Sequence, residues 1–230
     1  VERMQVQKPF MPDSTWLCVG HIDEFTTTIP DPSSPKGFRF VIADTDAAWA
    51  ILDELDPSMA IPQYSGGAFE GHYMDTIGDM VTDAGLRFLN EEIQETLDEQ
   101  KELFMRELGL EEEDIVYMPS LFEEVSGCGG LVAALIPGMA NLIIADVDGA
   151  PTAFIPDPFI RSDLNDQASD PVIAAVRAIF PESLGTVFVD DWSVYHMGLG
   201  EVHCGTNVER ETNNEWWADA GHLINQEVAQ

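Results

Sequence analysis

Two short strings near opposite ends of the 230-residue chain hold side chains that could do chemistry together. The first places His21 two residues before Asp23, and the second, within residues 200–205, holds His203 and Cys204 among glycines. A cysteine attacks as a thiolate, a histidine can carry protons, and a carboxylate can hold a cation. If the fold brings these groups together, the combination suits attack on a planar cation such as a guanidinium group.

The spacing within each string suggests which groups cooperate. Side chains two residues apart on a strand point to the same face, so His21 and Asp23 would enter one pocket. On an extended strand His203 would face away from Cys204, which leaves His21 as the better proton carrier for the thiol. Each string alone also has a plainer interpretation, as a polar strand end in the first case and a buried structural cysteine in the second.

Metal binding is not predicted at these strings. Histidine, aspartate and cysteine can all ligate zinc, but the chain has neither a Cys-x-x-Cys nor a His-Glu-x-x-His spacing. The three cysteines are too few for a disulfide framework, and their odd number leaves at least one thiol unpaired. Cys18 lies in an apolar segment and Cys128 among glycines, so we expect structural roles for both.

The composition limits the partners that the chain can bind. Asp and Glu number 42 against ten Lys and Arg, which gives a formal net charge of −32. Nucleic acid and anionic membranes are bound through clustered cations, so neither is expected as a partner. A cationic partner such as an arginine-bearing peptide would be attracted, although the plainer interpretation of the charge is solubility, including in a salty habitat. Hydrophobic residues make up 45% of the chain, so it should fold.

The sequence leaves the compartment open, cytoplasmic or secreted. No apolar run approaches the roughly 20 residues of a membrane-spanning helix. The first residues, Val1 to Met4, fit neither a signal peptide nor a natural start, which predicts that the chain begins inside a longer protein.

Hydrophobic patterns predict an α/β fold in which strand–helix–strand units recur, without a clear domain boundary. We expect strands where apolar or β-branched residues run together, at 16–19, 38–43, 141–145, 186–189 and 192–196. We expect helices where apolar residues recur every three or four positions, at 46–55, 89–108 and from 170 until Pro181. Residues 62–71 and 151–167 are typical of loops.

Together these strings resemble the catalytic domain of the peptidylarginine deiminases. Residues 16–25, Trp-Leu-Cys-Val-Gly-His-Ile-Asp-Glu-Phe, are similar to that family's Trp-Leu-x-Val-Gly-His-Val-Asp-Glu-Phe. Residues 200–208, Gly-Glu-Val-His-Cys-Gly-Thr-Asn-Val, reproduce its nucleophile string. The segment that begins at Arg106, residues 154–158 and the tryptophan pair at 216–217 also resemble segments of that family. They occur in the same order as in the family, over nearly the whole chain.

The resemblance implies a partial five-bladed α/β propeller of the pentein type, built from repeated ββαβ units. Residues 1–230 would be the C-terminal portion of the catalytic domain, whose remaining part would complete the site. The implied reaction is hydrolysis of peptidyl arginine to peptidyl citrulline with release of ammonia. Cys204 would be the nucleophile, His21 the acid/base, Asp23 the guanidinium anchor and Val19 a contact for the substrate's alkyl stem. Calcium, with ligands mainly outside this chain, and a homodimer are also expected from the resemblance.

The chain departs from the family pattern in three places. The family's second anchoring aspartate lies in an upstream tryptophan-bearing segment that has no match here. Its basic pair before Gly200 is replaced by Gly198 and Leu199, and its basic run after Val208 is replaced by residues 209–212. Two alternatives therefore stay open. One is a pentein enzyme acting on free guanidines, such as an agmatine deiminase or an amidinotransferase, and the other is a non-catalytic fragment that binds basic proteins.

Overall fold

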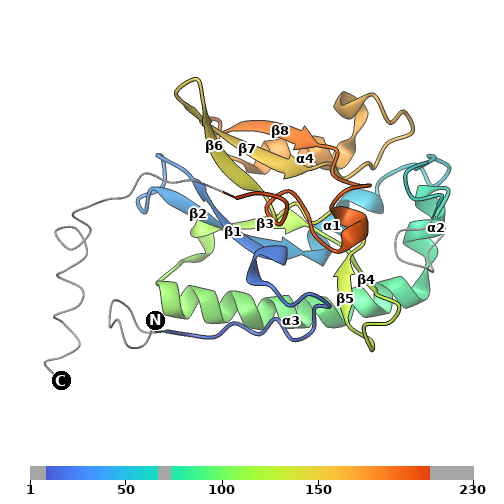
Figure 1. The fold of residues 1–230 in the computed structure, drawn as a ribbon, viewed down its shortest axis with the longest axis horizontal. Coiled ribbons are helices and arrows are strands. Elements are labelled where there is room, and N and C mark those ends of the chain that lie inside the picture. Colours follow the sequence, from blue (N-terminus) through green and yellow to red (C-terminus); the bar gives the residue numbers. More distant parts are fainter. Residues whose placement is uncertain (1–8, 67–73, 208–230) are drawn as a thin grey trace, which may run out of the picture. The chain divides into compact units, whose positions relative to one another are not determined.

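The chain contains both strands and helices, which confirms the predicted α/β class (Figure 1). The fold is that of a computed structural model, which describes residues 9–66 and 74–207. Every helix and strand of the described residues belongs to one unit, Asp13–Thr206. In this described part of the chain, no helix is both long enough and apolar enough to span a bilayer.

The first sheet consists of β1 (Thr26–Pro30), β2 (Phe38–Asp44) and β3 (Ile115–Pro119), in that order. β1 pairs antiparallel with β2, with Thr28 opposite Phe40, and β2 pairs parallel with β3, with Ile42 opposite Tyr117. A parallel return needs a long crossover, which here contains α1 (Thr45–Leu52), α2 (Ile77–Thr82) and α3 (Ala84–Leu108).

The second sheet repeats this plan with β6 (Ile143–Val147), β7 (Ala150–Pro156) and β8 (Gly185–Val189). β6 and β7 are antiparallel, β7 and β8 are parallel, and α4 (Pro171–Ile179) lies in the crossover. Each sheet therefore follows the chain order strand, strand, helical crossover, strand, which contains the strand–helix–strand unit expected from the sequence and has the ββαβ order that the resemblance implies. A hairpin of β4 (Phe122–Glu124) and β5 (Val132–Ala134) separates the two ββαβ units along the chain.

The two units share one apolar core, to which Val41, Leu135, Ile155 and Val176 all contribute. Helix α3 runs beside the first sheet and the hairpin (Figure 1), and it contacts both β2 and β4. This helix begins five residues before its predicted start at Leu89, because the Asp83 side chain caps it by accepting a hydrogen bond from Leu86 N at 2.9 Å.

Two predicted strands do not form. Residues 16–19 contribute only an isolated bridge between Leu17 and Val132, because residues 14–17 form a tight turn in which Leu17 N donates to Ser14 O. Residues 192–196 form a turn, because the Asp191 carbonyl accepts hydrogen bonds from the backbone N–H groups of Val194, Tyr195 and His196. In both segments local hydrogen bonds outweigh a β-branched and aromatic composition.

The predicted loop 151–167 is also partly wrong, because its first residues form β7. The remainder is held by Arg161, a buried cation that contacts Asp157 and Asp170. Residues 67–71 of the other predicted loop, and the tail pair at 216–217, lie outside the described residues.

Candidate active site

The first segment of the site is the turn that leads from Gly20 into β1. Gly20 has a φ of 82°, a left-handed conformation that glycine adopts readily, and its carbonyl accepts a hydrogen bond from Ser14 Oγ at 2.7 Å. His21 N then donates to Glu24 Oε1 at 2.6 Å, at the start of a 3₁₀ turn over Ile22–Glu24. Asp23 therefore lies in this turn, and the prediction that it shares a strand face with His21 is wrong.

The second segment is the turn that carries His203 and Cys204. Gly205 N donates to Glu201 O at 3.0 Å, so the chain folds back on itself here. A Cβ at Gly200 would lie 3.0 Å from Cys204 Cβ, and a Cβ at Gly205 would collide with the Tyr195 ring. The glycines of this string are therefore required by close packing within the protein.

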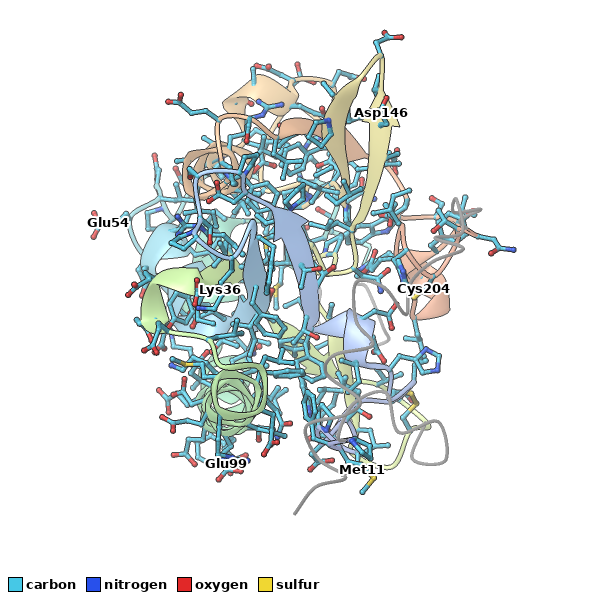
Figure 2. The ribbon with its side chains drawn as sticks, turned by 90° about the vertical axis from the view of Figure 1, so that its left-hand side faces the viewer. Met11, Lys36, Glu54, Glu99, Asp146 and Cys204 are labelled. Carbon is cyan, nitrogen blue, oxygen red and sulfur yellow. A yellow bond between two sulfur atoms is a disulfide. The ribbon has the colours of Figure 1, made fainter. Side chains whose placement is uncertain are left out.

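These two segments meet at the Asp23 carboxylate. His203 Nδ1 lies 2.7 Å from Asp23 Oδ2, and Cys204 Sγ lies 3.9 Å from the same oxygen. The adjacent side chains of His203 and Cys204 thus reach one group, because residues 202–205 form a turn and not the expected strand. Cys204 is exposed, and Figure 2 shows it at the edge of the molecule.

Asn141, which no sequence pattern indicated as a site residue, connects the same groups. Its side-chain Nδ2 donates to Asp23 Oδ2 at 2.8 Å and to Asp23 O at 3.0 Å. Its Oδ1 accepts a hydrogen bond from Cys204 N at 3.1 Å, and its backbone carbonyl accepts one from His203 N at 3.0 Å. Asn141 is the first residue of the strand predicted at 141–145, although β6 begins only at Ile143, and nothing in the sequence marked it as a site residue.

His21 and Val19, the other predicted site residues, lie on the same segment as Asp23. Both are exposed. Among the described residues, the His21 side chain makes no hydrogen bond or ion pair with Cys204 or Asp23. A disulfide between Cys18 and Cys128 fastens this segment to the loop of the β4–β5 hairpin, which gives both cysteines the structural role expected of them.

Negative charge surrounds the thiol. Partial burial raises the pKa of Cys204 above its ordinary value, and the charges of Asp23 and Glu24 raise it further. Hydrogen bonds with the Glu201 backbone and with Asn141 act in the opposite direction. In this arrangement the thiol is largely protonated at neutral pH, and a cation bound at Asp23 would favour the thiolate.

A buried cluster of Asp191, His196 and Glu201 supports the nucleophile turn from inside. Glu201 Oε1 accepts a hydrogen bond from Gly138 N at 2.9 Å and lies 2.7 Å from His196 Nδ1. Burial, followed by repulsion from Glu201, raises the pKa of Asp191 to about 8, and burial raises that of Glu201 to about 7. Burial lowers the pKa of His196 to about 4, so this histidine is neutral at pH 7.

The described residues do not supply a metal site. Within 9–66 and 74–207, no group of three or more His, Cys, Asp or Glu side chains is arranged to hold a metal ion.

The geometry defines a cysteine, histidine and carboxylate cluster on a mixed α/β scaffold. Residues 1–218 match the family model described as protein-arginine deiminase. The chain is 34% identical over 220 residues to protein-arginine deiminase type-1 of Mus musculus, covering 94% of this chain and 31% of that relative. It is 33% identical over 222 residues to protein-arginine deiminase type-4 of Homo sapiens, covering 93% and 31%. The chain therefore belongs to the protein-arginine deiminase family, and it spans 31% of the length of these relatives.

Proposed function

We propose that this chain carries the nucleophile of an enzyme that hydrolyses peptidyl arginine to peptidyl citrulline and ammonia. The observation that supports it most directly is the exposed Cys204 thiol 3.9 Å from the Asp23 carboxylate. A thiol beside a carboxylate is poorly activated by itself, but it suits a cationic substrate that neutralises the carboxylate on binding. The names of the relatives agree with this reaction.

Asp23 is proposed to bind the guanidinium group, whose planar fork of N–H donors matches a carboxylate in a way that lysine cannot. In the structure Asp23 Oδ2 already contacts His203 and Asn141, so the substrate would use Oδ1 or displace the exposed His203. Val19 would contact the alkyl stem of the arginine. A second carboxylate is proposed to come from the part of the catalytic domain that lies outside this chain.

In the proposed reaction the Cys204 thiolate forms a bond from Sγ to the central guanidinium carbon. The C–N bond then breaks, and His21 gives a proton to the departing ammonia. Water next attacks the S-linked thiouronium carbon while His21 takes a proton from it, and the C–S bond breaks to release citrulline and restore Cys204. His21 is assigned this role by its place in the shared motif, two residues before Asp23.

The propeller fold, calcium binding and a homodimer are further parts of this proposal. The two ββαβ units are compatible with blades of a five-bladed pentein propeller, of which residues 1–230 would form the C-terminal portion. Calcium is proposed to bind through ligands that lie mainly outside this chain, and loss of activity on adding a chelator to the full-length protein would test that requirement. A homodimer would be tested by sedimentation.

The central experiment measures citrulline and ammonia released by the full-length protein from a blocked arginine peptide and from agmatine. The wild-type protein should turn over the peptide in preference to agmatine, and Cys204→Ser should abolish turnover while the thermal unfolding midpoint stays close to that of wild type. Preference for agmatine would favour an enzyme of free guanidines. Ammonia release retained by the folded Cys204→Ser variant would overturn the assignment of the nucleophile.

A further inference from the structure

The proposed anchor and the proposed nucleophile, 181 residues apart in the chain, are joined by one buried side chain. Asn141 is 1% exposed, and its carboxamide hydrogen-bonds to the Asp23 carboxylate on one side and to Cys204 N on the other. Because both contacts come from one rigid planar group, the carboxamide sets the separation between the carboxylate and the nucleophile turn.

The chemistry of the two partners requires a carboxamide at this position. The backbone N–H of Cys204 can only donate, and the ionised carboxylate of Asp23 can only accept. A terminal amide offers an acceptor and a donor from the same end, which ionised aspartate, leucine and serine cannot do at this spacing. The same partners fix the orientation of the amide, with Oδ1 toward Cys204 and Nδ2 toward Asp23.

Asn90 shows what a purely structural asparagine looks like in this protein. It is also fully buried, and its side chain donates to the carbonyls of Leu86 and Phe122 and accepts from Phe122 N, at 2.8–2.9 Å. All of these partners are backbone groups, and the two bonds with Phe122 join α3 to β4. Asn141 instead contacts the carboxylate and the cysteine that the proposed reaction uses.

The segment that presents Asn141 is itself fixed against the nucleophile turn. Asn141 N donates to Gly138 O at 2.9 Å, and Gly138 N donates to the Glu201 side chain at 2.9 Å. Residues 138–141 therefore hold the turn through the Glu201 carboxyl, the His203 backbone and the Cys204 backbone. Because its backbone is held by these hydrogen bonds, the Asn141 side chain can keep the Asp23 turn and the Cys204 turn in a fixed geometry.

We propose that Asn141 is a positioning residue, which holds the Asp23 carboxylate and the Cys204 turn in the arrangement that the reaction needs. This inference rests on the proposed function. It adds a residue that touches neither the reacting carbon nor the leaving group and acts through Asp23 and Cys204.

The most informative variant is Asn141→Asp, which keeps the shape and the acceptor for Cys204 N but loses the donors to Asp23. A second carboxylate would face Asp23, and although such a pair shares a proton at low pH, both groups are ionised in the alkaline range where the thiol titrates. The thiol already faces Asp23 and Glu24, with the buried Glu201 behind its turn and His203 beside it. An added charge should therefore shift the pH midpoint of Cys204 alkylation by iodoacetamide upward by about one unit. At pH 7.5, kcat/KM for the arginine peptide should fall about 100-fold.

Asn90→Asp is the matched control, because it changes an equally buried asparagine away from the site. It should lower the thermal unfolding midpoint of the full-length protein but leave the pH midpoint of Cys204 alkylation unchanged. Cys204 is the free thiol among the described residues, so mass spectrometry of its peptide reports the reaction directly.

Unchanged alkylation in folded Asn141→Asp, or a shift equal to that of Asn90→Asp, would overturn the inference. If Asn141→Asp does not fold, Asn141→Ser removes the bridge without adding charge, and kcat/KM should fall at least about 10-fold with the fold retained. A change within about twofold would again overturn the inference. If the wild-type protein hydrolyses no arginine substrate, the proposed function fails, while the alkylation measurements still decide the role of Asn141.

Discussion

Replacing Arg161 with alanine should lower the free energy of unfolding by about 3–5 kcal/mol. Arg161 is 2% exposed, and its guanidinium group binds Asp157 through two hydrogen bonds of 2.6 and 2.9 Å and Asp170 through one of 3.2 Å. It also donates to the Leu164 carbonyl. Without this cation two buried carboxylates have no partner charge, and the cost of burying them unpaired accounts for the expected decrease in the free energy of unfolding.

The assay is urea unfolding at pH 7, followed by tryptophan fluorescence. Trp192 is buried and lies 5.8 Å, ring to ring, from Phe159 in the loop that Arg161 holds, so its emission should respond to this region. Arg106→Ala is the matched control, because that side chain is 65% exposed and its ion pair with Glu107 should contribute at most about 1 kcal/mol.

The pH dependence gives a second check on the Arg161 variant. Burial raises the pKa of Asp170, and removing Arg161 should raise it further, so the folded variant keeps protons that its unfolded chain releases. The loss of unfolding free energy caused by Arg161→Ala should therefore be largest near pH 7 and should shrink as the pH falls below about 4, where the carboxyl is protonated in the unfolded chain as well. An Arg161→Ala loss no larger than that of Arg106→Ala at pH 7 would refute the reasoning.

Three further predictions test the site and its support. Asp23→Asn keeps the shape of the anchor but removes its charge, so kcat/KM for the arginine peptide should fall about 100- to 1000-fold, and kinetics within about threefold of wild type would argue against an anchoring role. Asp191→Asn should stabilise the protein more at pH 8 than at pH 5. The pKa of Asp191 rises from its ordinary 3.8 to about 8 on folding, so the wild-type protein loses folding stability as the pH rises between these values, whereas the variant does not. An equal shift in Tm at both pH values would contradict this. The double change Cys18→Ser and Cys128→Ser removes a cross-link over 110 residues and should lower the free energy of unfolding by about 2–4 kcal/mol, whereas unchanged urea unfolding would exclude a stabilising disulfide.

The sequence predicted those elements that depend on hydrophobic pattern. The runs at 38–43 and 186–189 lie within β2 and β8, and the periodic segments became α1, α3 and α4. These elements bury their apolar faces in the common core, and the burial of those faces is what the hydrophobic pattern in the sequence reflects.

The sequence did not predict the arrangement within the site. His203 was expected to face away from Cys204, but a turn brings both side chains to Asp23. Asn141 was missed because its partners are 63 and 118 residues away and no local pattern indicates such a bond. Residues 192–196 were misjudged because composition does not reveal the hydrogen bonds that a single carbonyl, Asp191 O, accepts.

The most direct test of the central claim compares two labels of Cys204 in the full-length protein. A haloacetamidine carries a cation resembling guanidinium, and iodoacetamide of similar size is neutral. If Asp23 guides cations to the thiol, the amidine should label Cys204 faster than iodoacetamide does in the wild-type protein, and Asp23→Asn should abolish that preference. Equal labelling by the two reagents in the wild-type protein, or a preference that survives in Asp23→Asn, would contradict the account.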